Sequence, residues 1–281
     1  MEEEIVLVTG TSAGLGLSTV QVLAKQTDKK FKVYASMRKT SKRDELLEKT
    51  AGCRNVVVIE MDVCSEDSVN AAVKEILEKE GRIDVVVNNA GIGWSGILEV
   101  QPWESITSIY DTNVYGVLRV IRAVVPSMKK NKKGRIINIS SVAGLHNNPF
   151  MTVYGSANCA VEGITDSLAP ELASFNVHIA TIQPGVIKTR ALSQFAFNSG
   201  QLADDDPSKL LGEKYLKARG ALILNQAQTP EEVAEYILKA ITDENPQPHY
   251  MTSEAFEEFV KSKYRDLTGR IPFEMSKTFL Q

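Results

Sequence analysis

The segment that decides the fold is Ile5-Val6-Leu7-Val8-Thr9-Gly10-Thr11-Ser12-Ala13-Gly14-Leu15-Gly16, close to the start of the chain. Its first half is a short continuous apolar run, typical of a strand that is buried in a parallel sheet. Its second half is a glycine-rich turn, and residues 15–27 after it are helix-like. Glycines let the backbone approach a pyrophosphate closely, and a helix N-terminus offers unpaired N–H groups and a partial positive charge. The strand–turn–helix context therefore predicts nucleotide binding at this turn.

The same alternation of short apolar runs and helix-like segments continues along the chain. A βαβ rhythm of this kind implies right-handed crossovers and helices on both faces of a parallel sheet. We therefore predict an α/β fold with a Rossmann-type doubly wound parallel sheet of about seven strands, flanked by helices, in a single domain over residues 1–281. The predicted strands are Ile5–Thr9, Lys32–Met37, Val56–Met61, Ile83–Asn88, Arg135–Ser140, Val177–Gln183 and His249–Met251, and the predicted helices are 15–27, 40–50, 66–80, 103–129 and 152–174.

Residues 190–229 break this rhythm and are predicted to be a long, irregular insertion that serves as a substrate loop or lid. The insertion contains the acidic Asp204-Asp205-Asp206-Pro207 and the basic stretch Lys214–Arg219. Thr229-Pro230-Glu231-Glu232 then predicts a helix start, with Thr as N-cap and Pro at the first helical position. Residues 252–281 are predicted to form a helical, amphipathic C-terminal tail, with Phe256, Phe259 and Val260 on one face.

The composition argues against several classes of protein. The net charge of −3 gives no electrostatic basis for binding nucleic acid or an anionic membrane. The longest apolar runs are of strand length, far from the roughly 20 residues of a membrane span. Cys53, Cys64 and Cys159 have no metal-ligand spacing and make no disulfide framework, and the N-terminus Met1-Glu2-Glu3-Glu4 is unlike a secretory signal. We therefore expect no metal site, no transmembrane segment and a cytoplasmic location.

The end of the second predicted strand bears on the cofactor. An acidic residue at this place would bind the ribose hydroxyls of NAD, but the strand ends Ser36-Met37-Arg38-Lys39. The Arg38 guanidinium suits a 2′-phosphate, and Ser12 in the turn can add a hydroxyl. These residues favour NADP(H) over NAD(H). The alternative is that Arg38 and Lys39 are solvated residues that follow a strand.

Together, the motifs resemble the short-chain dehydrogenase/reductase family over about residues 4–250. The resemblance rests on the turn Thr9–Gly16, the strand-four motif Asn88-Asn89-Ala90-Gly91, the catalytic positions Asn113, Ser141 and Tyr154, the nicotinamide segment Pro184-Gly185 with Thr189, and the adenine-contacting pair Asp62-Val63. It implies cofactor contacts from Gly10, Thr11, Ser12, Gly14, Leu15, Gly16, Arg38, Asp62, Val63, Asn89, Ala90, Gly91, Tyr154, Asn158, Pro184, Gly185, Val186 and Thr189.

In that family, hydride passes between nicotinamide C4 and a carbonyl carbon. The resemblance implies that Tyr154 exchanges a proton with the substrate oxygen, that Ser141 hydrogen-bonds the same oxygen, and that the backbone carbonyl of Asn113 binds a water molecule.

Finer features are similar to the branch of 17β-hydroxysteroid dehydrogenase type 1 and photoreceptor retinol dehydrogenase: Phe31–Ala35 with Arg38, Asn148-Pro149-Phe150, and Pro230–Ala234. This branch implies a lipophilic alcohol or ketone, such as a steroid or retinoid. It also implies a homodimer that forms through the two long helices.

One position departs from the family pattern. Asn158 stands four residues after Tyr154, where the family has a lysine that lowers the pKa of the tyrosine and hydrogen-bonds the nicotinamide ribose. An amide can reach the ribose, but it carries no charge to favour the phenolate. Three alternatives follow: a working enzyme that favours reduction, an enzyme slowed by a natural or engineered replacement, or an NADP(H)-binding protein without turnover.

The substrate residues follow less clearly from the sequence. Ser141 and Tyr154 would contact the reacting oxygen, and His146, five residues after Ser141, can reach the same pocket or be a loop histidine without a chemical role. Phe195 and Phe197 are either lid contacts on a lipophilic substrate or packing residues. The insertion has no readable code for the substrate, and the sequence fixes neither its identity nor the direction of the reaction.

Overall fold

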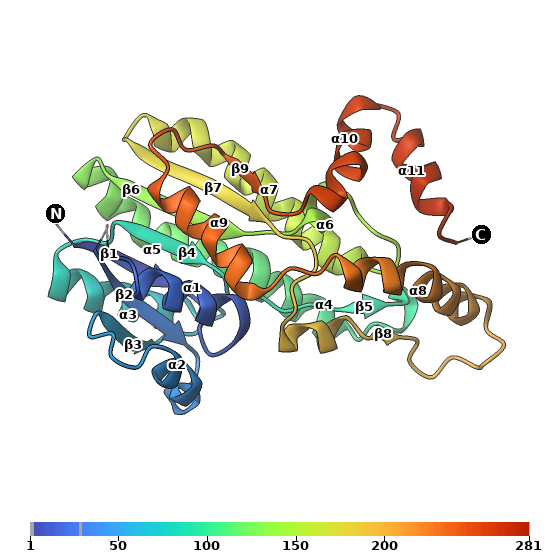
Figure 1. Ribbon diagram of the computed structural model, residues 1–281, viewed down its shortest axis with the longest axis horizontal. Helices are drawn as coiled ribbons and strands as arrows, with labels where there is room; N and C mark the ends of the chain where they lie inside the picture. The colour runs from blue at the N-terminus through green and yellow to red at the C-terminus, as the bar shows by residue number, and fades with distance from the viewer. Residues whose placement is uncertain (1–2, 28–29, 281) are drawn as a thin grey trace.

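The computed structural model describes residues 3–27 and 30–280, and its centre is a seven-stranded parallel sheet (Figure 1). The strand order is β3-β2-β1-β4-β6-β7-β9, so Val6 of β1 lies beside Val33 on one side and Val85 on the other. This confirms the predicted doubly wound sheet. The strands are β1 Glu4–Val8, β2 Phe31–Met37, β3 Val56–Glu60, β4 Val85–Asn88, β6 Gly134–Ile139, β7 Val177–Gln183 and β9 His249–Met251. Met1 and Glu2 of the acidic N-terminus lie outside the described residues.

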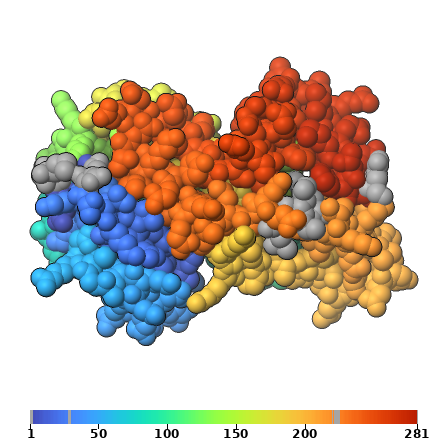
Figure 2. All heavy atoms as spheres, viewed as in Figure 1, coloured from blue at the N-terminus to red at the C-terminus, as the bar shows by residue number. Residues whose placement is uncertain are grey.

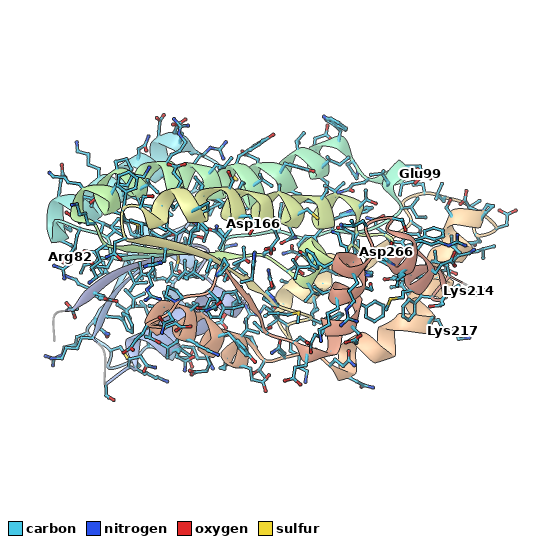
Figure 3. The ribbon with its side chains drawn as sticks, turned by 90° about the horizontal axis from the view of Figure 1, so that it is seen from above. Arg82, Glu99, Asp166, Lys214, Lys217 and Asp266 are labelled. Atoms are coloured by element: carbon cyan, nitrogen blue, oxygen red, sulfur yellow. The ribbon has the colours of Figure 1, made fainter. Side chains whose placement is uncertain are left out.

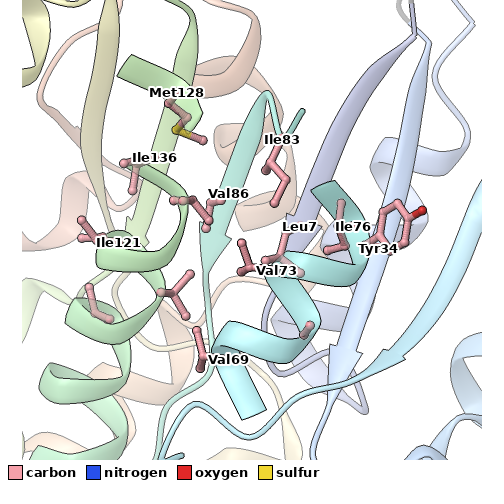
Figure 4. Close-up of a cluster of buried hydrophobic side chains, with 14 of the residues drawn as sticks. Leu7, Tyr34, Val69, Val73, Ile76, Ile83, Val86, Ile121, Met128 and Ile136 are labelled. Carbon is pink, nitrogen blue, oxygen red and sulfur yellow. The ribbon is translucent and has the colours of Figure 1, made fainter. Parts of the chain in front are cut away.

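Both faces of the sheet are covered by helices because successive strand residues point to opposite sides. Leu7 and Val86 pack with Val73 of α3 (Glu66–Glu80) and Ile121 of α5 (Gly116–Asn131) on one face (Figure 4). The neighbouring strand residues Val6, Val8, Val85 and Val87 pack with α1 (Gly14–Ala24) and α9 (Pro230–Thr242) on the other. Figure 3 shows the resulting three layers from above.

The helices agree with the predicted segments to within a few residues. A π-helical turn, Asp111–Tyr115, joins two α-helices into the long helical stretch that was predicted over 103–129. The helices are α1 Gly14–Ala24, α2 Asp44–Lys49, α3 Glu66–Glu80, α4 Trp103–Tyr110, α5 Gly116–Asn131, α6 Val142–Leu145, α7 Thr152–Ala173, α8 Pro207–Asn225, α9 Pro230–Thr242, α10 Glu257–Arg265 and α11 Arg270–Lys277. The predicted start of α9 is confirmed by a capping box between Thr229 and Glu232.

The insertion is more regular than the sequence suggested. A 3-10 turn, Arg190–Phe195, leads into a short strand, β8 (Phe197–Asn198), which pairs with β5 (Ser95–Gly96). The helix α8 follows, so the expectation of an irregular segment was wrong there. Asp206 and Pro207 start this helix, because the Asp206 carboxylate accepts hydrogen bonds from the N–H groups of Ser208 and Lys209.

The elements that surround the carboxyl ends of the strands come from distant parts of the chain. In Figure 1 the strands point toward the side where α6, α8 and α10 lie. In an open parallel sheet, ligands bind at this edge, where the strand order reverses, here between β1 and β4. Among the described residues, no helix is long and apolar enough to cross a membrane.

Candidate active site

The glycine-rich turn between β1 and α1 lies at the edge where the strand order reverses. Gly10 has φ +70°, and a Cβ atom there would stand 2.8 Å from the Cα of Ala90. A Cβ atom at Gly16 would stand 2.4 Å from both the Gly10 carbonyl oxygen and the Asn89 amide nitrogen. Side chains at either position would push the turn away from β4. The turn therefore requires glycine, and its backbone remains open to a close-lying ligand.

Several predicted cofactor residues hold this turn in place. The Asn89 side chain donates to the carbonyl oxygens of Thr9 and Gly10 at 2.8 and 3.1 Å. The Thr11 hydroxyl donates to the Ser36 carbonyl at 3.0 Å, and Thr11 is fully buried. These side chains fix the backbone and are not available to a ligand. Ser12, by contrast, is only half-buried in this turn.

The N-terminus of α1 suits an anion. Ala13 is the N-cap, and its side chain cannot satisfy the free N–H groups of the first turn, in which no residue is acidic. Gly14 has φ +61° and faces the Thr189 methyl group, which a Cβ atom at Gly14 would meet at 3.4 Å. The turn and the nicotinamide segment thus lie side by side. This arrangement fits the pyrophosphate of a dinucleotide.

The other predicted cofactor positions surround the same edge. Arg38 follows β2, is exposed, and forms no ion pair within the part of the chain that the structure describes. Asp62 follows β3, where its carboxylate accepts from the Cys64 N–H at 2.9 Å. The Val63 side chain is buried against Gly116, which leaves only its backbone for an adenine ring.

Ser141, Tyr154 and Asn158 come together beyond the ends of β6 and β7. Ser141 is the N-cap of α6, and its hydroxyl accepts from the Ala143 N–H at 3.1 Å. Tyr154 and Asn158 lie one turn apart on α7, where the Asn158 amide donates to the Tyr154 backbone carbonyl at 2.8 Å. Ser141 and Asn158 are buried, at 8% and 5% exposure.

Burial raises the pKa of Tyr154 above its ordinary value of 10.0. Side-chain hydrogen bonds with Ser141 and Asn158 offset part of this shift. Among the described residues, no charged side chain contributes to this pKa shift. The phenol is therefore protonated at neutral pH and suited to donate a proton.

Asn113 connects this group to the loop after β4. It lies in the π-helical turn, a feature that is frequent at functional sites. Its side chain exchanges two hydrogen bonds with the Ile92 backbone, at 2.9 and 2.8 Å. The Asn113 side chain also lies near Gly91, where an added Cβ atom would stand 3.6 Å from Oδ1. Asn113 thereby fixes the loop that faces Tyr154.

The segment after β7 is held from two sides. The Pro184 carbonyl accepts from the Val142 N–H at 2.9 Å, which joins it to the turn that carries Ser141. The Val186 carbonyl accepts from the Gln228 N–H at 2.9 Å. Phe256 of the tail packs on Gly185, where a Cβ atom would stand 2.8 Å from its ring. The only local signal for this contact is the predicted aromatic face of the tail.

His146 is buried at 6% exposure and lies against the C-terminal helices. Its ring centroid is 5.2 Å from that of Phe259, and its Nε2 is 3.4 Å from the Ser276 hydroxyl. A direct contact with substrate stays a prediction. A buried acid that sequence reasoning missed, Glu162, lies one turn beyond Asn158 and accepts from Thr181 and Gln183, both at 2.9 Å. Glu162 follows Asn158 by four residues in a predicted helix, and this spacing predicts that the two side chains lie on the same face.

A family model described as short chain dehydrogenase matches residues 4–198. The chain belongs to the short-chain dehydrogenase/reductase family. Retinol dehydrogenase 8 from Bos taurus is 34% identical over 98% of this chain and 89% of its own length. Human 17-beta-hydroxysteroid dehydrogenase type 1 is 34% identical over 96% of this chain and 83% of its own length. The chain is therefore an oxidoreductase related to retinol and steroid dehydrogenases.

Solved short-chain dehydrogenase/reductase structures agree with this fold. A structure of ElxO with NADP bound has a TM-score of 0.76, is 26% identical, and covers 92% of this chain and 100% of its own. A family member from Burkholderia phymatum in complex with NAD has a TM-score of 0.79 at 22% identity, over 96% and 95% of the two chains. Proteins of this fold thus bind either dinucleotide. Among the described residues, no group of three or more His, Cys, Asp or Glu side chains could hold a metal ion.

Proposed function

We propose that this protein is an NADP(H)-dependent oxidoreductase that interconverts a ketone or aldehyde and an alcohol on a lipophilic small molecule, with reduction favoured. The observation that carries the proposal is the group of Ser141, Tyr154 and Asn158, in which burial keeps the phenol protonated. A protonated tyrosine is an acid, so it is ready for carbonyl reduction. Oxidation would first require its deprotonation.

The cofactor, when bound, supplies or accepts the hydride. The glycine turn and the N-terminus of α1 would hold its pyrophosphate, with Ser12 adding a hydroxyl. Arg38 is exposed and unpaired within the described residues, which supports a role in binding a 2′-phosphate. Asp62, Val63 and the segments 89–91 and 184–189 would surround the adenine and nicotinamide ends.

The reacting residues then have distinct tasks. Tyr154 would donate a proton to the substrate oxygen, and Ser141 would hold that oxygen by a hydrogen bond. Asn158 would lower the pKa of Tyr154 slightly by its hydrogen bond, and its amide currently bonds the Tyr154 carbonyl. Asn113 would keep the loop at 91–93 in position.

A lipophilic substrate is supported by the related retinol and steroid dehydrogenases and by the aromatic residues near the site. The Phe150 ring lies 5.4 Å from both Phe197 of β8 and Tyr215 of α8. The insertion thus brings an apolar wall to the site, in keeping with its proposed role as a lid. A homodimer through α4, α5 and α7 is supported by the exposure of Trp103 (71%) and Tyr115 (50%).

A panel of ketones, aldehydes and alcohols tests the proposal, with NADPH and NADH compared at several pH values. Reduction of lipophilic ketones with NADPH, and much slower oxidation near pH 7, is the expected result. A chain that bound no dinucleotide, or that oxidised alcohols as fast as it reduced ketones at pH 7, would refute it.

A second function is favoured by Asn158 itself, which leaves Tyr154 without a neighbouring cation. Under this alternative the chain binds NADP(H) and does not turn over. Cofactor binding by fluorescence combined with no activity across the whole panel would establish it.

A further inference from the structure

The first part of the insertion crosses the candidate active site. The Gln194 side chain accepts from the Gly93 N–H at 2.7 Å, and β8 pairs with β5 through Ser95↔Phe197 and Gly96↔Asn198. At its start, Arg190 forms an ion pair with Glu45 of α2 at 3.0 Å. Figure 2 shows this gold segment at the surface, where it meets the blue N-terminal part of the chain. The segment is thus attached on both sides of the site.

Phe195 extends from this segment into the space between Tyr154 and the loop after β4. Its ring stands at 79° to the Tyr154 ring, with the centroids 4.8 Å apart. On the other side it touches Gly93, where a Cβ atom would lie 2.2 Å from the tip of the ring. The ring therefore fills the gap between α7 and residue 93.

A substrate must use the same gap. To receive the tyrosine proton, its oxygen has to come within about 2.6–3.2 Å of the phenol. A ketone and the Phe195 ring cannot occupy this place together, because close-packed atoms leave no room for both.

We propose that Phe195 controls access to Tyr154, and that its ring must move out of the gap before substrate binds. The expected change in kcat/KM rests on the proposed function. The expected change in the accessibility of Tyr154 does not. When only a fraction of molecules is open, the apparent affinity for substrate falls by that fraction.

The attachments of the segment are few enough for it to open. Phe195 is only half-buried, and Gln194 and Ala196 beside it are exposed. The Ala196 N–H bonds to Ser193 at 3.3 Å, inside the segment itself. Movement of residues 194–196 therefore breaks an aromatic contact and the Gln194–Gly93 hydrogen bond. The Arg190–Glu45 ion pair and the β8–β5 pairing hold the two ends of the segment, and the seven-stranded sheet is left intact.

The chain offers a matched control at Phe197. It lies two residues further along the same segment, but its ring packs against Phe150 and Gly212 instead of Tyr154. Phe195→Ala and Phe197→Ala therefore remove the same group from neighbouring positions. Phe195→Leu provides a milder change of the first position, and thermal unfolding of each variant shows whether it is folded.

The first experiment needs no turnover. N-acetylimidazole acetylates accessible tyrosines, and mass spectrometry of the peptide that carries Tyr154 gives its rate of modification. Tyr264 and Tyr115, at 66% and 50% exposure, serve as internal standards. We expect the Tyr154 rate to rise about tenfold in Phe195→Ala, to rise less in Phe195→Leu, and to stay at the wild-type value in Phe197→Ala. Equal rates in wild type and Phe195→Ala would overturn the proposal.

The second experiment uses the sign of a kinetic effect. If Phe195 blocks the site, Phe195→Ala raises kcat/KM for ketone reduction by about tenfold, mainly through KM, and leaves kcat within about twofold. If Phe195 is instead a wall that contacts bound substrate, the same change lowers kcat/KM, since apolar contact area is lost. A fall or no change would overturn the proposal. Faster labelling of Tyr154 without reduction of any ketone would sustain the access role and refute the proposed function.

Discussion

Replacing Asn158 by lysine tests whether one missing charge limits this enzyme. In the structure, Asn158 is buried one helical turn after Tyr154. Its side-chain hydrogen bond lowers the pKa of Tyr154, but by less than burial raises it. Burial acts in the opposite direction and raises that pKa. A lysine ammonium at this position would favour the phenolate directly. It would also donate hydrogen bonds to the ribose of the cofactor.

The size of the effect follows from Coulomb's law. Two unit charges about 4 Å apart interact by roughly 4 kcal/mol at an effective dielectric constant of about 20. This corresponds to about three pKa units, because one unit is about 1.4 kcal/mol. Burial of the ammonium costs part of this gain. We therefore expect Asn158→Lys to raise turnover in alcohol oxidation near pH 7 by about two orders of magnitude.

Steady-state oxidation of a lipophilic alcohol with NADP⁺, measured from pH 6 to 10, provides the assay. Asn158→Gln is the matched control, since it lengthens the side chain without adding charge. The lysine variant should gain most near pH 7 and less near pH 10, where the wild-type tyrosine begins to ionise. If the lysine variant kept the wild-type rate, or the glutamine variant matched the lysine variant, the electrostatic reasoning would be refuted.

Three further predictions follow from the site and the sheet edge. In the wild-type enzyme, the rate of alcohol oxidation should rise about tenfold per pH unit up to about pH 10, because the raised pKa of Tyr154 keeps the phenolate form scarce. The rate of ketone reduction should stay nearly constant between about pH 6 and 9. Initial rates measured in both directions check this. Arg38→Ala should weaken NADPH binding by about 10- to 100-fold and leave NADH binding nearly unchanged, measured by fluorescence titration, because it removes a charge-assisted contact to the 2′-phosphate. The Glu162 carboxylate, 3.3 Å from His249 Nδ1, raises the pKa of His249. The pair therefore stabilises the fold fully below the ordinary His pKa of about 6.5, and this stabilisation is lost as pH rises through the folded-state value. His249→Gln should therefore lower the midpoint of thermal unfolding more at pH 5.5 than at pH 8.5.

The fold was predictable because each strand carries its own signal. Runs such as Val85-Val86-Val87 are continuous and β-branched, as a strand covered on both faces requires. The structure places Val86 against α3 and α5, and its two neighbours against α1 and α9. The glycine turn was predictable for a similar reason, since its positive φ angles and close contacts admit no side chain.

The less regular parts depend on contacts that no local pattern encodes. The start of α8 is an exception, because Asp206 as cap and Pro207 at the first helical position are a local helix-start signal that the expectation of an irregular insertion overlooked. The position of Phe195 on Tyr154 is set by the pairing of β8 with β5, two-residue strands far apart in the chain. His146 is directed to the tail by aromatic packing on Phe259. Such long-range choices follow from the assembled fold, because short segments pair only where the rest of the chain brings them together.

The surroundings of Asn158 explain why a change of charge there need not disturb the fold. Tyr154, Asn158 and Glu162 occupy successive turns on one face of α7, so residue 158 lies between a phenol and a buried carboxylate. Glu162 Oε1 has no hydrogen-bond partner within the described residues, while Oε2 accepts from Thr181 and Gln183. A cation at residue 158 would lie near this carboxylate, which offsets part of the cost of burying an ammonium group. The same carboxylate would also draw the ammonium away from Tyr154. The gain in rate therefore depends on whether the ammonium group of Lys at position 158 lies closer to the Tyr154 phenol or to the Glu162 carboxylate. It does not depend on whether helix α7 accepts a lysine.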